Sequence, residues 1–269
     1  QAAGKTIDLL AGDEINMDID ARATANDADI RYEATTDDIT LGTIDAGSGN
    51  VLVMATAGSI NDLADSDAVD ILATDLSLVA GTDIGTGTNH IETTVTTLSS
   101  QTGGANGMFV TETNAVAINT VTVEVNRIDT DGATPAATTD KTLADLSATA
   151  NGNIILHADQ GITVNDANSN GLGVYARGSG NILLWAENSG DIVLQDSASI
   201  FTSSGNISVL AEENVWQKDN ANITSFGGTI DVWAETGSIT MNTGTYATTD
   251  DGSVGRNIRL KADQDVKLA

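Results

Sequence analysis

The feature that most constrains the fold is a short motif that recurs along most of the chain. It reads apolar, any, apolar, any, alanine, and nine copies keep all three fixed positions. Alanine makes up only 35 of 269 residues, so nine alanines at one offset are not expected by chance. A repeat of this kind indicates a fold built from stacked copies of one structural unit. The copies begin at Ile7, Ile30, Val51, Leu76, Ile154, Ile182, Ile207, Ile230 and Ile258.

The period of the pattern predicts strands rather than helices. Within each copy the apolar residues alternate with period two, and a second β-branched residue follows eight to ten positions after the first, as at Ile15, Ile39 and Ile192. Apart from a gap of 78 residues between Leu76 and Ile154, successive copies lie 21–28 residues apart, which allows two or three short strands per repeat. Gly-Asn pairs precede several copies, for example at Gly180-Asn181, and favour a corner with positive φ. Strands and corners of near-constant length predict an all-β parallel β-helix, or β-solenoid.

In this solenoid the motif predicts which side chains point inward. The first, third and fifth positions should face the core, and the alanines should form a column where the wall turns and space is tight. If the strands stack about 4.8 Å apart, this column runs the length of the repeat.

The motifs resemble the repeats of filamentous-haemagglutinin-like bacterial exoproteins and of very long bacterial surface proteins. The resemblance covers roughly three quarters of the chain and is carried by the segments SGNILLWAENSGDIVLQDSASIFTSSGNISVLAEENV (179–215), GTIDVWAETGSITM (228–241) and AGTDIGTGTNHIETTVTTLSSQTGGANGMFVTETNAVAI (80–118). It implies a right-handed β-helix, secretion to the bacterial cell surface, and an adhesive or fibrous role. The family's N-terminal secretion domain is not recognisable, so we expect a segment of the repeat shaft.

The middle of the chain departs from the pattern. We expect solenoid rungs over 1–84 and 151–269, with 85–150 forming either degenerate rungs or an insertion packed on the solenoid, in one continuous domain. Ile91, Val95 and Leu98 have helical spacing, whereas Val121, Val123 and Val125 alternate as in a strand.

Composition excludes several partners. The chain holds 38 acidic and 11 basic residues, for a net charge of −27, which would repel nucleic acid and anionic membranes. The apolar runs are far shorter than the roughly 20 residues that cross a bilayer, so we expect no membrane insertion. There is no cysteine, which excludes disulfides and thiolate chemistry.

Catalysis has little support in the sequence, and we expect no catalytic residue and no enzyme. His90 and His157 lie in different contexts, and no nucleophile elbow or phosphate loop is present. Asp37-Asp38 and Asp250-Asp251 are adjacent carboxylates in turn-like contexts. A polysaccharide-degrading β-helix enzyme, which needs two carboxyl groups facing a substrate, is therefore the weakest hypothesis.

Calcium is the one cofactor that the sequence suggests. Asp166, Asn168 and Asn170 alternate before Gly171, as in the first half of an oxygen-ligand loop, although the twelfth position is Arg177 rather than glutamate. Other dense acidic groups are Asp62, Asp65, Asp67 and Asp70, and Asp129 with Asp131. The alternative for each group is a solvated acidic surface.

The outward positions of the motif predict an exposed aromatic stripe formed by Trp185, Leu210 and Trp233. An apolar patch of this kind is normally covered. The candidates are the 85–150 segment, another copy or surface protein, or a cell-surface glycan stacked on the tryptophans.

The two ends of the repeat differ in charge. Residues 1–30 carry seven acidic and two basic side chains, for −5, and residues 251–269 carry three acidic and four basic ones, for +1. We expect Arg259 and Lys261 of one copy to meet Asp8, Asp13 or Glu14 of the next in a head-to-tail stack, or of flanking repeats in a longer chain.

These patterns together favour a structural module of a secreted bacterial surface adhesin or extracellular fibre. The alternative is a glycan-binding or calcium-binding surface module.

Overall fold

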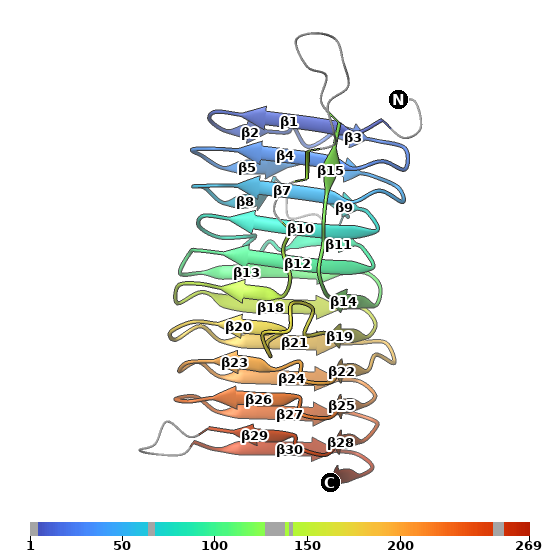
Figure 1. Ribbon diagram of the computed structural model, residues 1–269, viewed down its shortest axis with the longest axis vertical. Helices are drawn as coiled ribbons and strands as arrows, with labels where there is room; N and C mark the ends of the chain where they lie inside the picture. The colour runs from blue at the N-terminus through green and yellow to red at the C-terminus, as the bar shows by residue number, and fades with distance from the viewer. Residues whose placement is uncertain (1–4, 64–67, 127–137, 140–141, 250–255) are drawn as a thin grey trace.

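The chain folds as a parallel β-solenoid of about 10 turns, seen in a computed structural model that describes residues 5–63, 68–126, 138–139, 142–249 and 256–269 (Figure 1). Within these residues there is no helix, and every pair of solenoid strands is parallel. The predicted fold class is therefore confirmed. The helical spacing of Ile91, Val95 and Leu98 is misleading, since these residues lie in or next to strands β11 (Ile91–Thr94) and β12 (Thr97–Thr102).

Two walls enclose one continuous core. Wall A is the 16-stranded sheet, and wall B comprises the 10-stranded sheet together with the three-stranded sheet β2-β5-β8. In the first turns each repeat motif forms a long strand of wall A: β1 (Ile7–Ala11), β4 (Ile30–Ala34), β7 (Val51–Ala55) and β10 (Asp75–Ala80). Two short strands per turn build wall B there: β2 (Ile15–Asn16), β5 (Ile39–Leu41) and β8 (Ile60–Asp62) in one column, and β3 (Arg22–Thr24), β6 (Thr43–Asp45), β9 (Ile71–Leu72) and β11 in the other.

In the later turns this arrangement is reversed. The motif now forms the long strands of wall B, which are β18 (Asn153–Ala158), β21 (Ile182–Ala186), β24 (Ile207–Ala211), β27 (Ile230–Ala234) and β30 (Ile258–Ala262). Wall A is built there from two short columns: β14 (Val116–Ile118), β19 (Ile162–Val164), β22 (Ile192–Leu194), β25 (Val215–Gln217), β28 (Ile239–Met241) and β31 (Val266–Leu268), and β17 (Leu146–Ala148), β20 (Val174–Ala176), β23 (Ile200–Thr202), β26 (Asn222–Ser225) and β29 (Tyr246–Thr248).

One turn of two long strands makes the change. The first part of β12 pairs with β14 and its second part with β17, so one long column of wall A divides into two short ones. On wall B, β13 (Gly107–Glu112) pairs on one side with Ile84 and with β11, and on the other side with the long strand β18. The two short columns of wall B therefore merge into one long column. The repeat motif therefore occupies opposite walls in the two halves of the molecule.

The register places like residues on like residues. Ile182, Ile207 and Ile230 are direct neighbours on successive turns, and so are Ala186, Ala211 and Ala234. These inward side chains are at most 3% exposed. Burying branched side chains in such uninterrupted columns supplies the main stabilisation, since each is removed from water on both flanks.

The Gly-Asn corners form as predicted, but for a different reason. Gly180 and Gly205 do not have positive φ. A Cβ at Gly205 would instead collide with the carbonyl oxygen of Gly180 in the turn before it. The asparagines form a ladder in which the backbone N–H of Asn206 donates to Oδ1 of Asn181, at 2.9 Å, one turn away.

Residues 120–126 and 142–144 leave the solenoid and are called the strap here. Figure 1 shows the strap in green, running along the axis across the strands of wall A toward β1 and including β15 (Glu124–Val125), which pairs with β16 (Thr138–Thr139). Val121, Val123 and Leu143 of the strap bury Leu52 and Val79 in a second apolar cluster. The strap reaches the first turn, where the N–H of Asn126 donates to Oγ1 of Thr6 at 2.9 Å.

Candidate functional site

The two ends of the solenoid expose its core. At the first turn the inward-facing Leu9 is 41% exposed, and at the last turns Ile258 and Leu268 are 41% and 68% exposed. The corresponding motif positions in inner turns, Leu184, Ile182 and Leu194, are at most 2% exposed. Among the described residues, β1 pairs only with β4, β30 only with β27, and β31 only with β28. Each end therefore presents both apolar side chains and unpaired strand edges.

The charged residues predicted for end-to-end contact lie at these ends. Nε of Arg31 donates to Asp8 at 2.8 Å, and Nε of Arg259 donates to Asp231 at 2.7 Å. Both pairs join the second motif positions of adjacent turns. Asp13 and Glu14 lie in the exposed corner after β1, where Asp13 accepts a hydrogen bond from Oγ1 of Thr36. Asp8 belongs to wall A, whereas Arg259 and Lys261 belong to wall B.

The aromatic stripe lies on the outside of wall B. Trp185, Leu210 and Trp233 are direct neighbours on β21, β24 and β27 and line a shallow hollow with Ala211 and Glu235. The strap crosses wall A and does not cover them, and Trp185 remains 38% exposed.

Both tryptophans already have ring partners within the chain. The His157 ring stacks on Trp185 with centroids 4.3 Å apart, and Nζ of Lys261 lies 4.1 Å from the Trp233 centroid. His157 therefore lies against one face of the Trp185 ring, and Lys261 makes a cation–π contact with Trp233.

The Asp166 loop uses its polar atoms internally. Oδ1 of Asn168 accepts from the N–H of Asn170, and Oδ1 of Asn170 accepts from the N–H of Leu172. The two amide nitrogens donate to Oδ2 of the buried Asp145, at 2.8 and 3.2 Å. The loop is thus folded around Asp145, and the side-chain oxygens of Asn168 and Asn170 are directed at backbone N–H groups.

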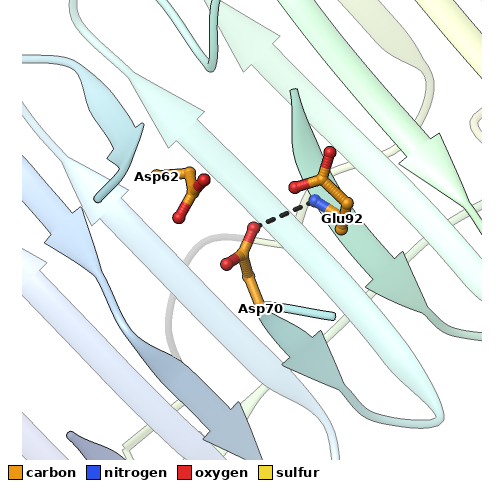
Figure 2. Close-up of side chains that lie close together, drawn as sticks. All are labelled: Asp62, Asp70 and Glu92. Carbon is orange, nitrogen blue, oxygen red and sulfur yellow. Dashed lines mark hydrogen bonds between the residues drawn. The ribbon is translucent and has the colours of Figure 1, made fainter. Parts of the chain in front are cut away.

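A different acidic group is brought together on wall B. Carboxylate oxygens of Asp62, Asp70 and Glu92 lie within 4.8 Å of one another, from β8, the residue before β9, and β11 (Figure 2). The backbone N–H of Glu92 donates to Asp70 at 3.0 Å. Three carboxylates at this spacing are the ligand type that Ca²⁺ prefers. Among the described residues, this is the group that could hold a metal ion.

The electrostatics of this cluster favour added positive charge. Burial, together with the charges of Asp62 and Glu92, raises the pKa of Asp70 to about 8, and the hydrogen bond from the Glu92 N–H opposes this. A proton or a divalent cation would relieve the repulsion. The sequence groups Asp62 with Asp70, but Glu92 comes from the next turn, 22 residues from Asp70, and was not predicted. Asp65, Asp67, Asp129 and Asp131 lie outside the described residues.

The carboxylates considered for catalysis have structural partners. Asp37 accepts from the N–H of Asp38, and Asp38 accepts from the N–H of Ser59, at 3.0 and 2.7 Å. These two carboxylates therefore stabilise the backbone of turns. Asp250 and Asp251 lie outside the described residues.

Comparison with protein-family models, with curated proteins and with solved structures finds no match to this chain. No helix among the described residues is long and apolar enough to span a membrane. The class of protein that the fold defines is a parallel β-solenoid.

Proposed function

We propose that this chain is a non-enzymatic structural module of a secreted bacterial surface adhesin or extracellular fibre, in which solenoids are joined end to end. The observation that carries the proposal is the exposure of core side chains at both ends, while the same positions inside are fully buried. Further rungs would cover these side chains and pair the strand edges. They would come from another copy or from flanking repeats of the same chain.

The charge of the chain is consistent with this role. At −27, lateral contact between solenoid sides is opposed by repulsion, which keeps such rods soluble. The ends differ, because the last strands carry Arg259, Lys261 and Lys267. Association is therefore least opposed along the axis. The resemblance of the motifs to haemagglutinin-like repeats supports the extracellular location.

Light scattering tests the stacking. The isolated chain should grow in mean mass with concentration, and Arg259→Glu combined with Lys261→Glu should weaken this growth. Arg177→Glu with Lys218→Glu makes the same change in charge away from the ends, and should have little effect. A chain that stays monomeric at high concentration would contradict stacking between copies and leave flanking repeats as the cover of the ends.

A calcium-stabilised module is the second candidate, and the cluster of Asp62, Asp70 and Glu92 favours it. If the cluster binds calcium, the ion should raise the melting temperature of chelator-treated protein, because it binds the folded state. Asp70→Asn should abolish this gain, whereas Asp166→Ala should retain it. The reverse result would assign calcium to the Asp166 loop, and no response would mean that neither group binds calcium.

Glycan binding by the stripe is tested separately. Trp185→Ala with Trp233→Ala should leave the fold intact and abolish any retention on immobilised cell-surface polysaccharide. Unchanged retention would exclude the stripe as the binding face.

A further inference from the structure

We propose that successive copies join with a half turn about the solenoid axis, so that wall B of one copy continues as wall A of the next. This inference rests on the proposed end-to-end stacking and specifies its geometry. It follows from the change of walls at β12 and β13. The repeat motif lies on wall A in the first described turns and on wall B in the last ones.

The two terminal motifs are interchangeable in spacing. The apolar residues of β1, β2 and the residue after β2 are Ile7, Leu9, Ala11, Ile15 and Met17. Those of β30 and β31 are Ile258, Leu260, Ala262, Val266 and Leu268. Every interval is the same in the two sets. β1 can therefore continue β30, and β2 can continue β31, with isoleucine on isoleucine, leucine on leucine and alanine on alanine. A half turn is what brings these strands together, because it exchanges the walls and also reverses the strand direction.

Stacking without rotation would bring different strands together. Leu10 of β1 and Thr248 of β29 are the two ends of a single column of wall A. This column passes through Glu33, Met54, Val79, Gln101, Ser147, Tyr175, Phe201 and Thr224. An unrotated joint would therefore place Thr248 beside Leu10 and would set the long strand β30 against the shorter strands β2 and β3. The half turn instead places Lys261 beside Leu10.

Charge also favours the half turn. Within each copy, Asp8 pairs with Arg31 at one end and Asp231 pairs with Arg259 at the other, all at the second motif position. In the half-turn joint Arg259 lies next to Asp8 of the following copy. The outer face then carries an unbroken alternation of charge: Asp231, Arg259, Asp8, Arg31. Opposite charges on adjacent strands stabilise this register.

One part of the joint is repulsive. The exposed corner of Asp13 and Glu14 would lie near the corner of Asp263 and Asp265. Because salt screens such exposed charges, moderate ionic strength should strengthen the association.

The joint also aligns the strap with the aromatic stripe. The strap lies outside wall A and reaches Thr6 in the first turn. In the half-turn joint that wall continues wall B of the preceding copy, which carries Trp233 and Lys261 near its end. The strap of one copy and the stripe of its neighbour would then share one outer face.

Engineered disulfides distinguish the two joints, since the chain has no cysteine of its own. Adjacent strands about 4.8 Å apart suit the Cα separation of a disulfide. Leu10→Cys with Lys261→Cys reports the half turn, and Leu10→Cys with Thr248→Cys reports the unrotated joint. The sites within one chain lie at opposite ends of the solenoid, so a disulfide forms only between copies. All three side chains are partly or largely exposed, and thermal melts before oxidation verify that the variants fold.

We expect mild oxidation to convert the Lys261→Cys variant into a ladder of covalent oligomers, with at least about tenfold less product from the Thr248→Cys variant. The opposite preference would overturn the half turn and retain end-to-end stacking. Concentration-dependent growth without either disulfide would also overturn the half turn. If neither disulfide forms and both variants remain monomeric, the proposed stacking of copies fails as well.

Discussion

At the fifth motif position the wall ends and the chain bends away, so the space beside each alanine is set by the turns above and below. Ala186 is fully buried between Ala158 and Ala211. Ala186→Leu should therefore overpack the core and lower the free energy of unfolding by about 1–3 kcal/mol. Ala105→Leu, at an exposed residue before β13, should be near neutral. Chemical denaturation of both variants checks this, and equal tolerance would remove the argument for the alanine column.

Glu112 occupies the same column, one turn before Ala158. It is fully buried and accepts hydrogen bonds from Oγ1 of Thr93 and the N–H groups of Val95 and Asn114. Burial raises its pKa from 4.5 to about 7, against the effect of these hydrogen bonds. The folded state then holds this proton more tightly than the unfolded state between about pH 4.5 and 7, so stability falls as the pH rises through this window.

Glu112→Gln should remove this contribution, which is on the order of 3 kcal/mol. Thermal melts at pH 5 and pH 8 should show a smaller fall for this variant than for the original chain, because the amide does not titrate. Glu235→Gln, at an exposed position, is the control and should leave the fall unchanged. An identical fall in all three proteins would mean that Glu112 does not hold its proton.

The orientation of a single side chain can be predicted from the sequence when it depends only on neighbouring residues of the same strand. The inward positions of Ile182 and Leu184 follow from alternation alone. The contact between Asp70 and Glu92 does not, because it depends on how one turn is aligned with the next. Gly205 was expected to be at a corner, but its close approach to Gly180 is likewise a contact between turns.

At the scale of elements, the strap forms a small core of its own. Val123 is 2% exposed and packs with Val121 and Leu143 over Leu52 and Val79, separately from the main core. Val123→Asp should therefore bury an unpaired charge and detach the strap while the solenoid stays folded. Hydrogen exchange should rise in residues 120–126 and 142–144 and stay unchanged in β18 to β28. Thr122→Asp, at a partly exposed neighbour, should have a smaller effect, and loss of protection in the solenoid would contradict the independence of the two cores.

The sequence could not predict which wall each motif occupies. The pattern of Ile30 to Ala34 is the same as that of Ile182 to Ala186, yet the first lies on wall A and the second on wall B. The motif changes walls between these two segments, at β12. Leu98, Ser100 and Thr102 of this strand point into the core, while its first part pairs with β14 and its second part with β17. Leu52 and Val79 occupy outward motif positions, so the sequence pattern predicts that they are exposed. They are buried because the strap, more than forty residues later in the chain, packs over them.

For the whole molecule, three observations support end-to-end stacking. The core is exposed at both ends, the terminal motifs share one spacing, and the alternating charges of Asp231 and Arg259 continue in Asp8 and Arg31. Each exposed ion pair contributes only about 0–1 kcal/mol. The affinity would therefore come from the buried apolar ends and the continued strand pairing, and the charges would set the register.

End-to-end stacking of the chain would be visible in electron micrographs of concentrated protein at moderate ionic strength. We expect straight, unbranched filaments one solenoid wide, with a subunit repeat of about 50 Å from ten turns of roughly 4.8 Å. Single short rods at every concentration, or clusters joined through their sides, would contradict end-to-end stacking.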